Sequence, residues 1–183
     1  LYKLFSRMLC QRLTEVILSN QSSEQAAYRK GFSTEDHLLT TTLLVEGCSE
    51  WKADLWIALV DFEKAFDSVE HDKLWEALAE QGVHESYISL IKRLYADQKA
   101  CVHLGVDSRD FKLTRGVKQG DPVSGLLFIA VLEAIMRRVK ANRERLNQRR
   151  SGWGFAVPVT AADEDLTNLR LADGVLLSAT NRG

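Results

Sequence analysis

The sequence has no long apolar segment and almost no net charge. Its longest apolar run, Val123 to Met136, is interrupted by Glu133 and is too short to span a bilayer, so we expect no membrane partner. The formal net charge of −1 argues against a partner that is held by overall charge alone. A nucleic-acid-binding protein with this balance would need its basic residues gathered locally.

Disulfide and zinc-ligand patterns are absent too. The cysteines are odd in number, far apart and outside any Cys-x-x-Cys spacing, and the histidines are equally scattered; these residues are Cys10, Cys48, Cys101, His37, His71, His84 and His103. This usage indicates a reducing compartment inside the cell, nucleus or cytoplasm, and no zinc site. The chain begins at Leu1 rather than methionine and ends soon after a predicted strand, as expected of a fragment of a longer protein.

What is present is the composition of a soluble globular domain, with 183 residues of which 45% are hydrophobic and 27% charged. Apolar spacing predicts four helices: residues 1–18, a second from a cap at Thr34 to about Cys48, a third around Leu74 and Leu78 to Gly82, and a fourth over Tyr87–Tyr95. The short unbroken apolar run from Leu55 to Val60 predicts a strand buried on both faces.

The second half of the sequence predicts two hairpins and a long helix. Alternating apolar residues from Val102, resumed at Phe111 after a polar turn, predict the first hairpin. Asp121-Pro122 predicts an N-cap and a first helical position, and the helix to Met136 is apolar nearly all round, so we expect it to be buried against a sheet. Near the end of the chain, Asp173-Gly174 between apolar runs predicts a type I′ hairpin turn. The whole is an α+β domain.

Two aspartates follow predicted strands. Asp61 ends the apolar run 55–60, and Asp173 follows residues 169–172. Each of them, taken alone, is explained as a strand-end or turn residue that faces water. If the two strands lie side by side, however, the carboxylates can share a site for divalent cations, because Mg²⁺ is commonly held by one or two carboxylates plus substrate phosphates.

Two other segments suit a phosphate-bearing ligand. The Gly-flanked loop within residues 115–128 leads into a helix N-terminus, where free N–H groups favour anions, although a plain loop-to-helix entry explains it equally well. The tract from Arg137 to Arg150 has one acid, Glu144, and is either a site of phosphate-backbone contact or a solvated helix face. Its residues assigned to nucleic-acid contact are Arg137, Arg138, Lys140, Arg143 and Arg145.

In order and spacing, four segments resemble the reverse transcriptase domain of non-LTR (LINE-type) retrotransposons. They are "EQAAYRKGFSTEDHLL", "LVDFEKAFDSVEHDKLWEAL", "RGVKQGDPVSGLLF" and "LTNLRLADGVLL", and they cover nearly the whole chain. The resemblance implies a right-hand polymerase fold that lacks its thumb. The fingers would occupy about residues 1–53, and the palm, with a small antiparallel sheet backed by helices, about residues 54–183.

The resemblance also implies roles for individual residues. Asp61 and Asp173 would carry catalysis and hold two Mg²⁺ or Mn²⁺ ions. Phe66 would lie under the sugar of the incoming nucleotide and exclude a 2′-hydroxyl. The other nucleotide-binding positions, near the base pair or the triphosphate, are Gln119, Gly120, Arg29 and Lys30.

The chain departs from the family pattern at several positions. Gly174 replaces the second Asp of the hairpin pair, Leu171 replaces its usual Phe, Gly125 replaces a Pro, and Ala27-Tyr28 replaces Gly-Phe. The first of these changes removes a carboxylate from the site where a primer 3′-hydroxyl would attack an α-phosphate. Removing one preorganised electrostatic group typically costs on the order of 10²–10³ in rate, so severe impairment is expected rather than complete inactivity.

Three functions are consistent with these expectations. The first is an RNA-directed DNA polymerase that extends a DNA primer on an RNA template with dNTPs, weakly or not at all in this copy. The second is a non-catalytic nucleic-acid-binding remnant, whose salt-sensitive binding Asp61→Ala would leave unchanged. The third is a decaying reading frame without a selected role, which the sequence alone does not separate from the second.

Overall fold

A computed structural model describes residues 1–105, 107–147 and 168–179, with the backbone alone at 143–147. The chain forms two compact units. Unit 1 consists of Leu1–Gln21 and Lys64–Ala134, and unit 2 of Ser22–Glu63 and Ile135–Gly183. In the described ranges no helix is both long and apolar enough to cross a membrane. The division into fingers over residues 1–53 and palm over 54–183 stays a prediction.

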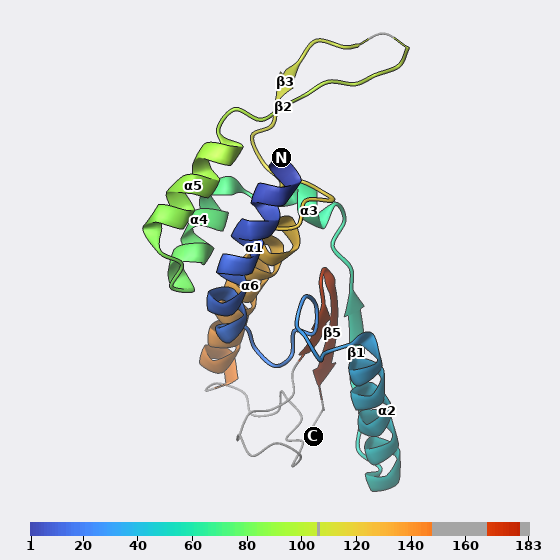
Figure 1. Cartoon of the computed structure of the whole chain (residues 1–183). Coiled ribbons are helices and arrows are strands. Elements are labelled where there is room, and N and C mark those ends of the chain that lie inside the picture. The colour runs from blue at the N-terminus through green and yellow to red at the C-terminus, as the bar shows by residue number, and fades with distance from the viewer. Residues whose placement is uncertain (106, 148–167, 180–183) are drawn as a thin grey trace. The chain divides into compact units, whose positions relative to one another are not determined.

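Unit 1 is built mainly of helices (Figure 1). They are α1 (Tyr2–Ser19), α3 (Ala65–Ser68), α4 (His71–Glu80), α5 (Glu85–Tyr95) and the first part of α6 (Ser124–Asn147). Part of each predicted apolar stripe forms its core, in which Leu13, Leu78 and Ile91 are at most 1% exposed, whereas Leu4 and Met8 of α1 are exposed. Buried amide groups join these helices as well, since Gln81 Nε2 donates to the Ala130 carbonyl oxygen of α6 at 2.7 Å.

The predicted first hairpin is present but much shorter than expected. β2 (Lys99–Ala100) pairs antiparallel with β3 (Phe111–Lys112), and the alternating residues from Val102 lie in the connecting loop. Figure 1 shows this hairpin projecting beyond α5. Val102 and Leu104 are 48% and 86% exposed, so the alternation finds no apolar surface to cover. Alternation favours a strand only where one face can be packed.

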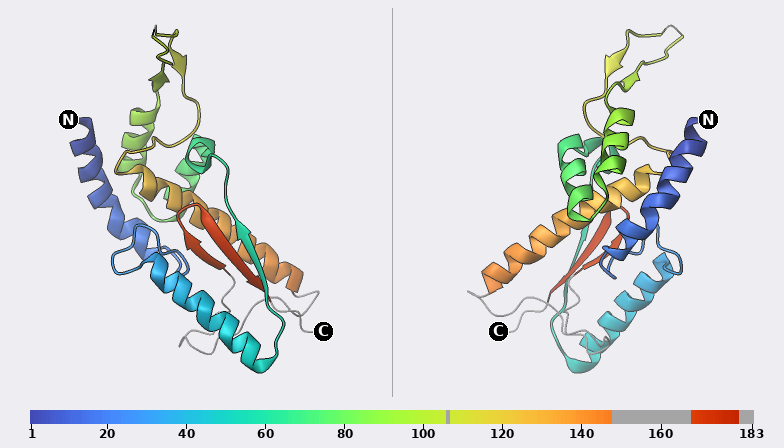
Figure 2. Two further views of the ribbon diagram at one scale, coloured as in Figure 1. Left: turned by 90° about the vertical axis from the view of Figure 1, so that its right-hand side faces the viewer. Right: turned by 60° about the vertical axis from the view of Figure 1, so that its left-hand side comes forward.

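Unit 2 contains α2 (Thr34–Trp51) and a three-stranded antiparallel sheet. The strands are β1 (Trp56–Val60), β4 (Asn168–Leu171) and β5 (Gly174–Ala179), in the order β1-β5-β4. The views in Figures 1 and 2 show β5 beside β1. Helix α2 is capped by Ser33 rather than by the predicted Thr34. Ser33 stands three residues before Asp36, as a capping box requires, and Thr34 does not. The Ser33 hydroxyl accepts a hydrogen bond from the Asp36 N–H, and the Asp36 carboxylate accepts one from the Ser33 N–H.

Strand β1 is exposed rather than buried on both faces. All five of its residues are exposed, Leu59 at 81%. β1 is an edge strand that pairs with β5 on one side. The unbroken apolar run correctly predicts a strand, but the run does not reveal what covers the faces of the strand, so the predicted burial is wrong.

Candidate active site

The hairpin of β4 and β5 turns at Ala172 and Asp173. Leu171 pairs with Gly174, so the two residues between them are the central residues of the turn, and of these only Ala172 has a positive φ, 53°. The predicted type I′ turn centred on Asp173-Gly174 is therefore wrong, and Gly174 begins β5. The position of the turn follows from the pairing of β4 with β5, which runs from Asn168↔Leu177 to Leu171↔Gly174, and this extended pairing outweighs the preference of one dipeptide.

Strand β1 brings Asp61 to the end of the sheet that carries Asp173. β1 pairs antiparallel with β5 from Trp56↔Ala179 to Val60↔Val175, and this register continued by one residue sets Asp61 opposite Gly174. The two strands that the aspartates follow, β1 and β4, belong to one sheet but do not lie side by side as expected, because β5 lies between them. Asp61 is exposed and Asp173 is partly exposed. Both residues thus lie at one end of one sheet.

The donor set at this end of the sheet consists of carboxylate oxygens. Mg²⁺ is a hard cation that takes oxygen ligands and is usually held by one or two carboxylates plus substrate phosphates. The described part of the chain contains no group of three or more His, Cys, Asp or Glu that could hold a metal. Asp61 and Asp173 supply the kind of oxygen donor that Mg²⁺ takes, and the binding of an ion by these two carboxylates stays a prediction.

Gly174 leaves room for a side chain. A Cβ at this position would lie 3.5 Å from the Leu171 carbonyl oxygen, which is an ordinary van der Waals contact. The φ of Gly174 lies outside the left-handed region that favours glycine. The backbone would therefore accept an aspartate here without strain, so the glycine is not required by the fold.

In unit 1, the loop that begins at Arg115 is joined to the segment 66–70 by backbone contacts. The Gly116 N–H donates to the Val69 carbonyl oxygen at 2.7 Å, and the Val117 N–H donates to that of Phe66 at 2.8 Å. These bonds connect the second sequence motif directly to the middle of the first. The close approach depends on glycine, because Gly116 has a φ of 94° and lies against the backbone of Asp67.

We expect Gly116→Ala to lower the free energy of unfolding of unit 1 by about 2 kcal/mol. The new Cβ would lie 3.1 Å from both the Cα and the carbonyl oxygen of Asp67, so backbone must move. Gly120→Ala is the matched control: its φ is also positive, at 76°, but a Cβ there meets nothing within 4 Å. Gly120→Ala should lower the free energy of unfolding by about 1 kcal/mol, because only the positive φ disfavours alanine there. Equal losses in urea unfolding would show that the Asp67 contact has no effect.

Phe66, Gln119 and Gly120 all lie in unit 1. The half-buried Phe66 ring stacks on the buried ring of Phe128 in α6, with centroids 4.8 Å apart and planes 12° apart. Gln119 is exposed, with its Nε2 3.5 Å from Asp67 Oδ1, and Gly120 is also exposed. Stacking gives the Phe66 ring a fixed orientation. The nucleotide contacts of these three residues stay predictions.

Asp121 does not cap α6. The helix begins at Ser124, and the buried Asp121 carboxylate accepts hydrogen bonds from the hydroxyls of Tyr2, at 2.7 Å, and Ser6. Burial and this bond raise the pKa of Tyr2 well above its usual range. The predicted cap, with Pro122 as the first helical residue, fails because α1 supplies hydroxyl donors that local sequence does not show.

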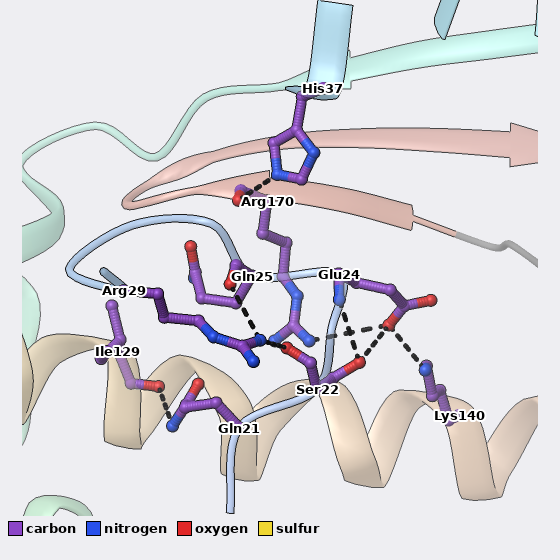
Figure 3. A network of polar contacts seen from close by, with 9 residues as sticks. All are labelled: Gln21, Ser22, Glu24, Gln25, Arg29, His37, Ile129, Lys140 and Arg170. Atoms are coloured by element: carbon purple, nitrogen blue, oxygen red, sulfur yellow. Dashed lines mark hydrogen bonds and ion pairs between the residues drawn. The ribbon is translucent and has the colours of Figure 1, made fainter. Parts of the chain in front are cut away.

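Arg29 is bonded to its own loop in unit 2. Its Nη1 donates to the Ser22 carbonyl oxygen at 2.9 Å (Figure 3). Its guanidinium lies 4.1 Å from the centroid of the Phe32 ring. Lys30 is exposed. Arg29 therefore shapes the loop, and contact of Arg29 and Lys30 with a triphosphate stays a prediction.

The basic tract on α6 is described in part. Arg137 and Arg138 are exposed, whereas Lys140 Nζ lies 2.6 Å from Glu24 Oε2. Lys140 is thus engaged in an ion pair within unit 2. Arg143 and Arg145 belong to α6, but their side chains lie outside the described part of the chain, as do Arg149 and Arg150 entirely.

Sequence reasoning missed a buried polar cluster beside β4, drawn in Figure 3. Arg170 and Glu24 are 1% and 7% exposed, and Arg170 Nη2 lies 3.6 Å from Glu24 Oε2. The Arg170 N–H donates to the Glu24 carbonyl oxygen at 2.8 Å, and the Ala26 N–H donates to that of Arg170 at 3.0 Å. Arg170 alternates with leucines in a predicted strand, a pattern typical of a solvent-facing residue. Its burial was therefore not evident.

The loop before α2 also reaches the turn that carries Asp173. Gln25 is completely buried, and its Oε1 accepts a hydrogen bond from the Ala172 N–H at 3.3 Å. Burial and, to a lesser extent, the negative charge of Asp173 raise the pKa of Tyr28 in the same loop. Neither contact could be found from the sequence, because each joins residues that lie far apart along it.

Comparison with known proteins gives matches along the whole chain. The family described as "Reverse transcriptase (RNA-dependent DNA polymerase)" matches residues 1–181. The chain is 29% identical over 187 residues to a Retrovirus-related Pol polyprotein from the type-1 retrotransposable element R2 of Popillia japonica. The aligned region covers 99% of this chain and 24% of that protein. It is 32% identical over 139 residues to the protein of the same name from Nasonia vitripennis, over 75% of this chain and 13% of that one. The chain therefore spans at most about a quarter of these relatives.

Among solved structures, the chain is similar to apo telomerase from Candida tropicalis truncated from its C-terminal domain. The TM-score is 0.62 at 18% identity, over 99% of this chain and 35% of that one. At this identity the likeness concerns the fold alone, and it agrees with an α+β polymerase domain of helices and small antiparallel sheets.

Proposed function

Because the chain belongs to the reverse transcriptase (RNA-dependent DNA polymerase) family, in the group found in non-LTR retrotransposons, we propose that it extends a DNA primer on an RNA template. The observation that carries this proposal is the pairing of β1 with β5, which sets Asp61 at the end of the sheet where the hairpin turns at Asp173. A primer 3′-hydroxyl would attack the α-phosphate of a dNTP there, and pyrophosphate would leave.

Asp61 and Asp173 would hold two Mg²⁺ or Mn²⁺ ions. When bound, such ions stabilise the attacking and leaving oxygens of an in-line displacement. The contribution of the chain would be to hold the two carboxylates at one sheet end before substrate arrives, since the paired strands end directly beside Asp61 and Asp173. A preorganised charge needs no reorganisation at the moment of reaction, and this is the main electrostatic source of catalysis.

The other proposed contacts concern the nucleotide and the template. Phe66, held flat against Phe128, would present its ring to the sugar and exclude a 2′-hydroxyl. The remaining residues proposed to contact the base pair or the triphosphate are Gln119, Gly120, Arg29 and Lys30. Gly174 makes the proposed activity weak in this chain, because it supplies no carboxylate opposite Asp61.

Primer extension on an RNA template tests the proposal. Since the chain covers 24% of the Popillia japonica relative, the assay uses a chimera that adds the flanking segments of that protein. Product should require dNTPs and Mg²⁺ or Mn²⁺, and Asp61→Ala should abolish it. Asp97→Ala, which removes an exposed aspartate of unit 1 outside the proposed site, should leave the product yield unchanged. Extension that survives Asp61→Ala would overturn the proposal.

A second candidate function is nucleic-acid binding without catalysis. The exposed residues Arg137 and Arg138 on α6 favour it. RNA binding would then weaken steeply with salt, because each neutralised phosphate releases counterions, and Asp61→Ala would not change the affinity. Salt-sensitive binding with no metal-dependent extension would support this function over the first.

A further inference from the structure

We propose that Gln25 is a positioning residue for Asp173, acting through the backbone of the hairpin turn. The inference rests on the proposed function, in which Asp173 binds a divalent ion. Gln25 itself would touch neither the ion nor the substrate. It would fix the conformation of Ala172, whose peptide group leads directly into Asp173.

The contact consists of one buried side-chain oxygen that accepts two backbone N–H groups. Gln25 is 0% exposed, and its Oε1 accepts from the Ala27 N–H at 3.0 Å and from the Ala172 N–H at 3.3 Å. The first bond lies within the loop and the second crosses to the hairpin. Because both donors are backbone groups, the bonds hold the amide of Gln25 in one orientation and tie the turn to the loop.

The turn needs such a contact because Ala172 lies in the left-handed region, with a φ of 53°. An L-residue in this region is strained, and the conformation persists only where surrounding structure holds it. The Cβ of alanine is the cause of the strain, and a glycine at the same position would be free of it. The turn thus combines a conformation that is unfavourable by itself with a buried acceptor for its N–H.

The loop is placed firmly enough to act in this way. Gln25 forms a parallel β-bridge with Arg170. Two backbone hydrogen bonds flank this bridge: the Arg170 N–H donates to the Glu24 carbonyl oxygen at 2.8 Å, and the Ala26 N–H donates to the Arg170 carbonyl oxygen at 3.0 Å. His37 Nε2 also lies 2.9 Å from the Arg170 carbonyl oxygen. The loop is therefore paired with β4 at the residue two positions before Ala172, and the Gln25 side chain reaches the turn from there.

A second buried glutamine in the chain provides a matched control. Gln21 is 8% exposed, and its Nε2 lies 3.2 Å from Gln81 Oε1 and 3.5 Å from the Ile129 carbonyl oxygen, all within unit 1. Figure 3 shows Gln21 directed to Ile129 of α6. Replacing Gln21 removes a buried amide of the same kind without removing a contact to the hairpin turn.

The experiment compares Gln25→Met and Gln21→Met with the unaltered 183-residue chain, since methionine keeps the volume and removes the amide. NMR measures amide exchange in β4, β5 and the turn, and the broadening of signals at 171–175 by Mn²⁺ alone gives its affinity. Gln25→Met should speed exchange of the Ala172 amide about 10-fold or more relative to the amides of β5. It should also weaken Mn²⁺ binding about 10-fold, the lower end of the effect of outer-shell partners. Gln21→Met should change neither quantity.

A rescue separates positioning from simple destabilisation. Ala172→Gly removes the strain at positive φ, so in the Gln25→Met background it should restore much of the Mn²⁺ affinity. Should Gln25→Met unfold unit 2, Gln25→Glu keeps an acceptor oxygen and should keep the Ala172 amide protected. Loss of that protection in Gln25→Glu would overturn the proposal.

Unchanged Ala172 exchange and unchanged Mn²⁺ affinity in Gln25→Met would also overturn it. If Mn²⁺ fails to bind even the unaltered chain, the metal site of the proposed function is wrong. The exchange rates then still decide whether Gln25 holds the turn, so the two failures are distinguishable.

Discussion

Gly174→Asp is expected to raise the rate of primer extension about 100- to 1000-fold, the usual effect of one preorganised electrostatic group in an active site. The register of β1 and β5 sets position 174 opposite Asp61, so the new carboxylate would join the donor set at that end of the sheet. The backbone accepts the change, because a Cβ at 174 would lie 3.5 Å from the Leu171 carbonyl oxygen. Steady-state extension with the chimera described above measures the gain.

Two controls define the cause of that gain. Gly174→Asn adds a side chain of the same size without the charge and should recover little of the rate. Asp61→Ala in the Gly174→Asp background should abolish extension, since it removes the carboxylate opposite position 174. If the unaltered sequence extends a primer as well as Gly174→Asp does, Asp61 and Asp173 suffice, and the expectation of impairment is wrong.

Glu24→Gln is expected to lower the free energy of unfolding of unit 2 by about 3 kcal/mol, because removing one partner of a buried ion pair leaves uncompensated charge. The Glu24 Oε2 atom lies 3.6 Å from Arg170 Nη2 and 2.6 Å from Lys140 Nζ. Arg170 is 1% exposed and Glu24 is 7% exposed, so water screens this pair little. Urea unfolding followed by NMR signals of β4 and β5 measures the loss.

The matched control is an exposed ion pair of the same charge types. Glu76 lies 2.8 Å from Lys73, and their side chains are 47% and 54% exposed. Glu76→Gln should cost less than about 1 kcal/mol, as exposed pairs generally do. If Glu24→Gln and Glu76→Gln cost the same, the buried cluster does not hold the loop against β4, and the basis for a fixed loop weakens.

The sequence alone determined the elements whose cause is local. Helices α1, α4 and α5 follow from apolar residues three and four positions apart, because these residues share one helix face whatever surrounds the helix. Asp61 and Asp173 are candidates for a similar reason, since each follows directly on its own apolar run. The four motifs that resemble the family are also short continuous segments of the sequence.

The tertiary structure alone decided the contacts between distant segments. Asp121 binds Tyr2, which lies 119 positions away, instead of capping its own helix. Strand register placed Gly174 past the turn, and pairing with the loop at Gln25 buried Arg170. The physical reason is the same in each case. A polar group takes the partner that the folded chain brings within hydrogen-bond distance, and a strand faces whatever covers it, so neither outcome is encoded in the neighbouring residues.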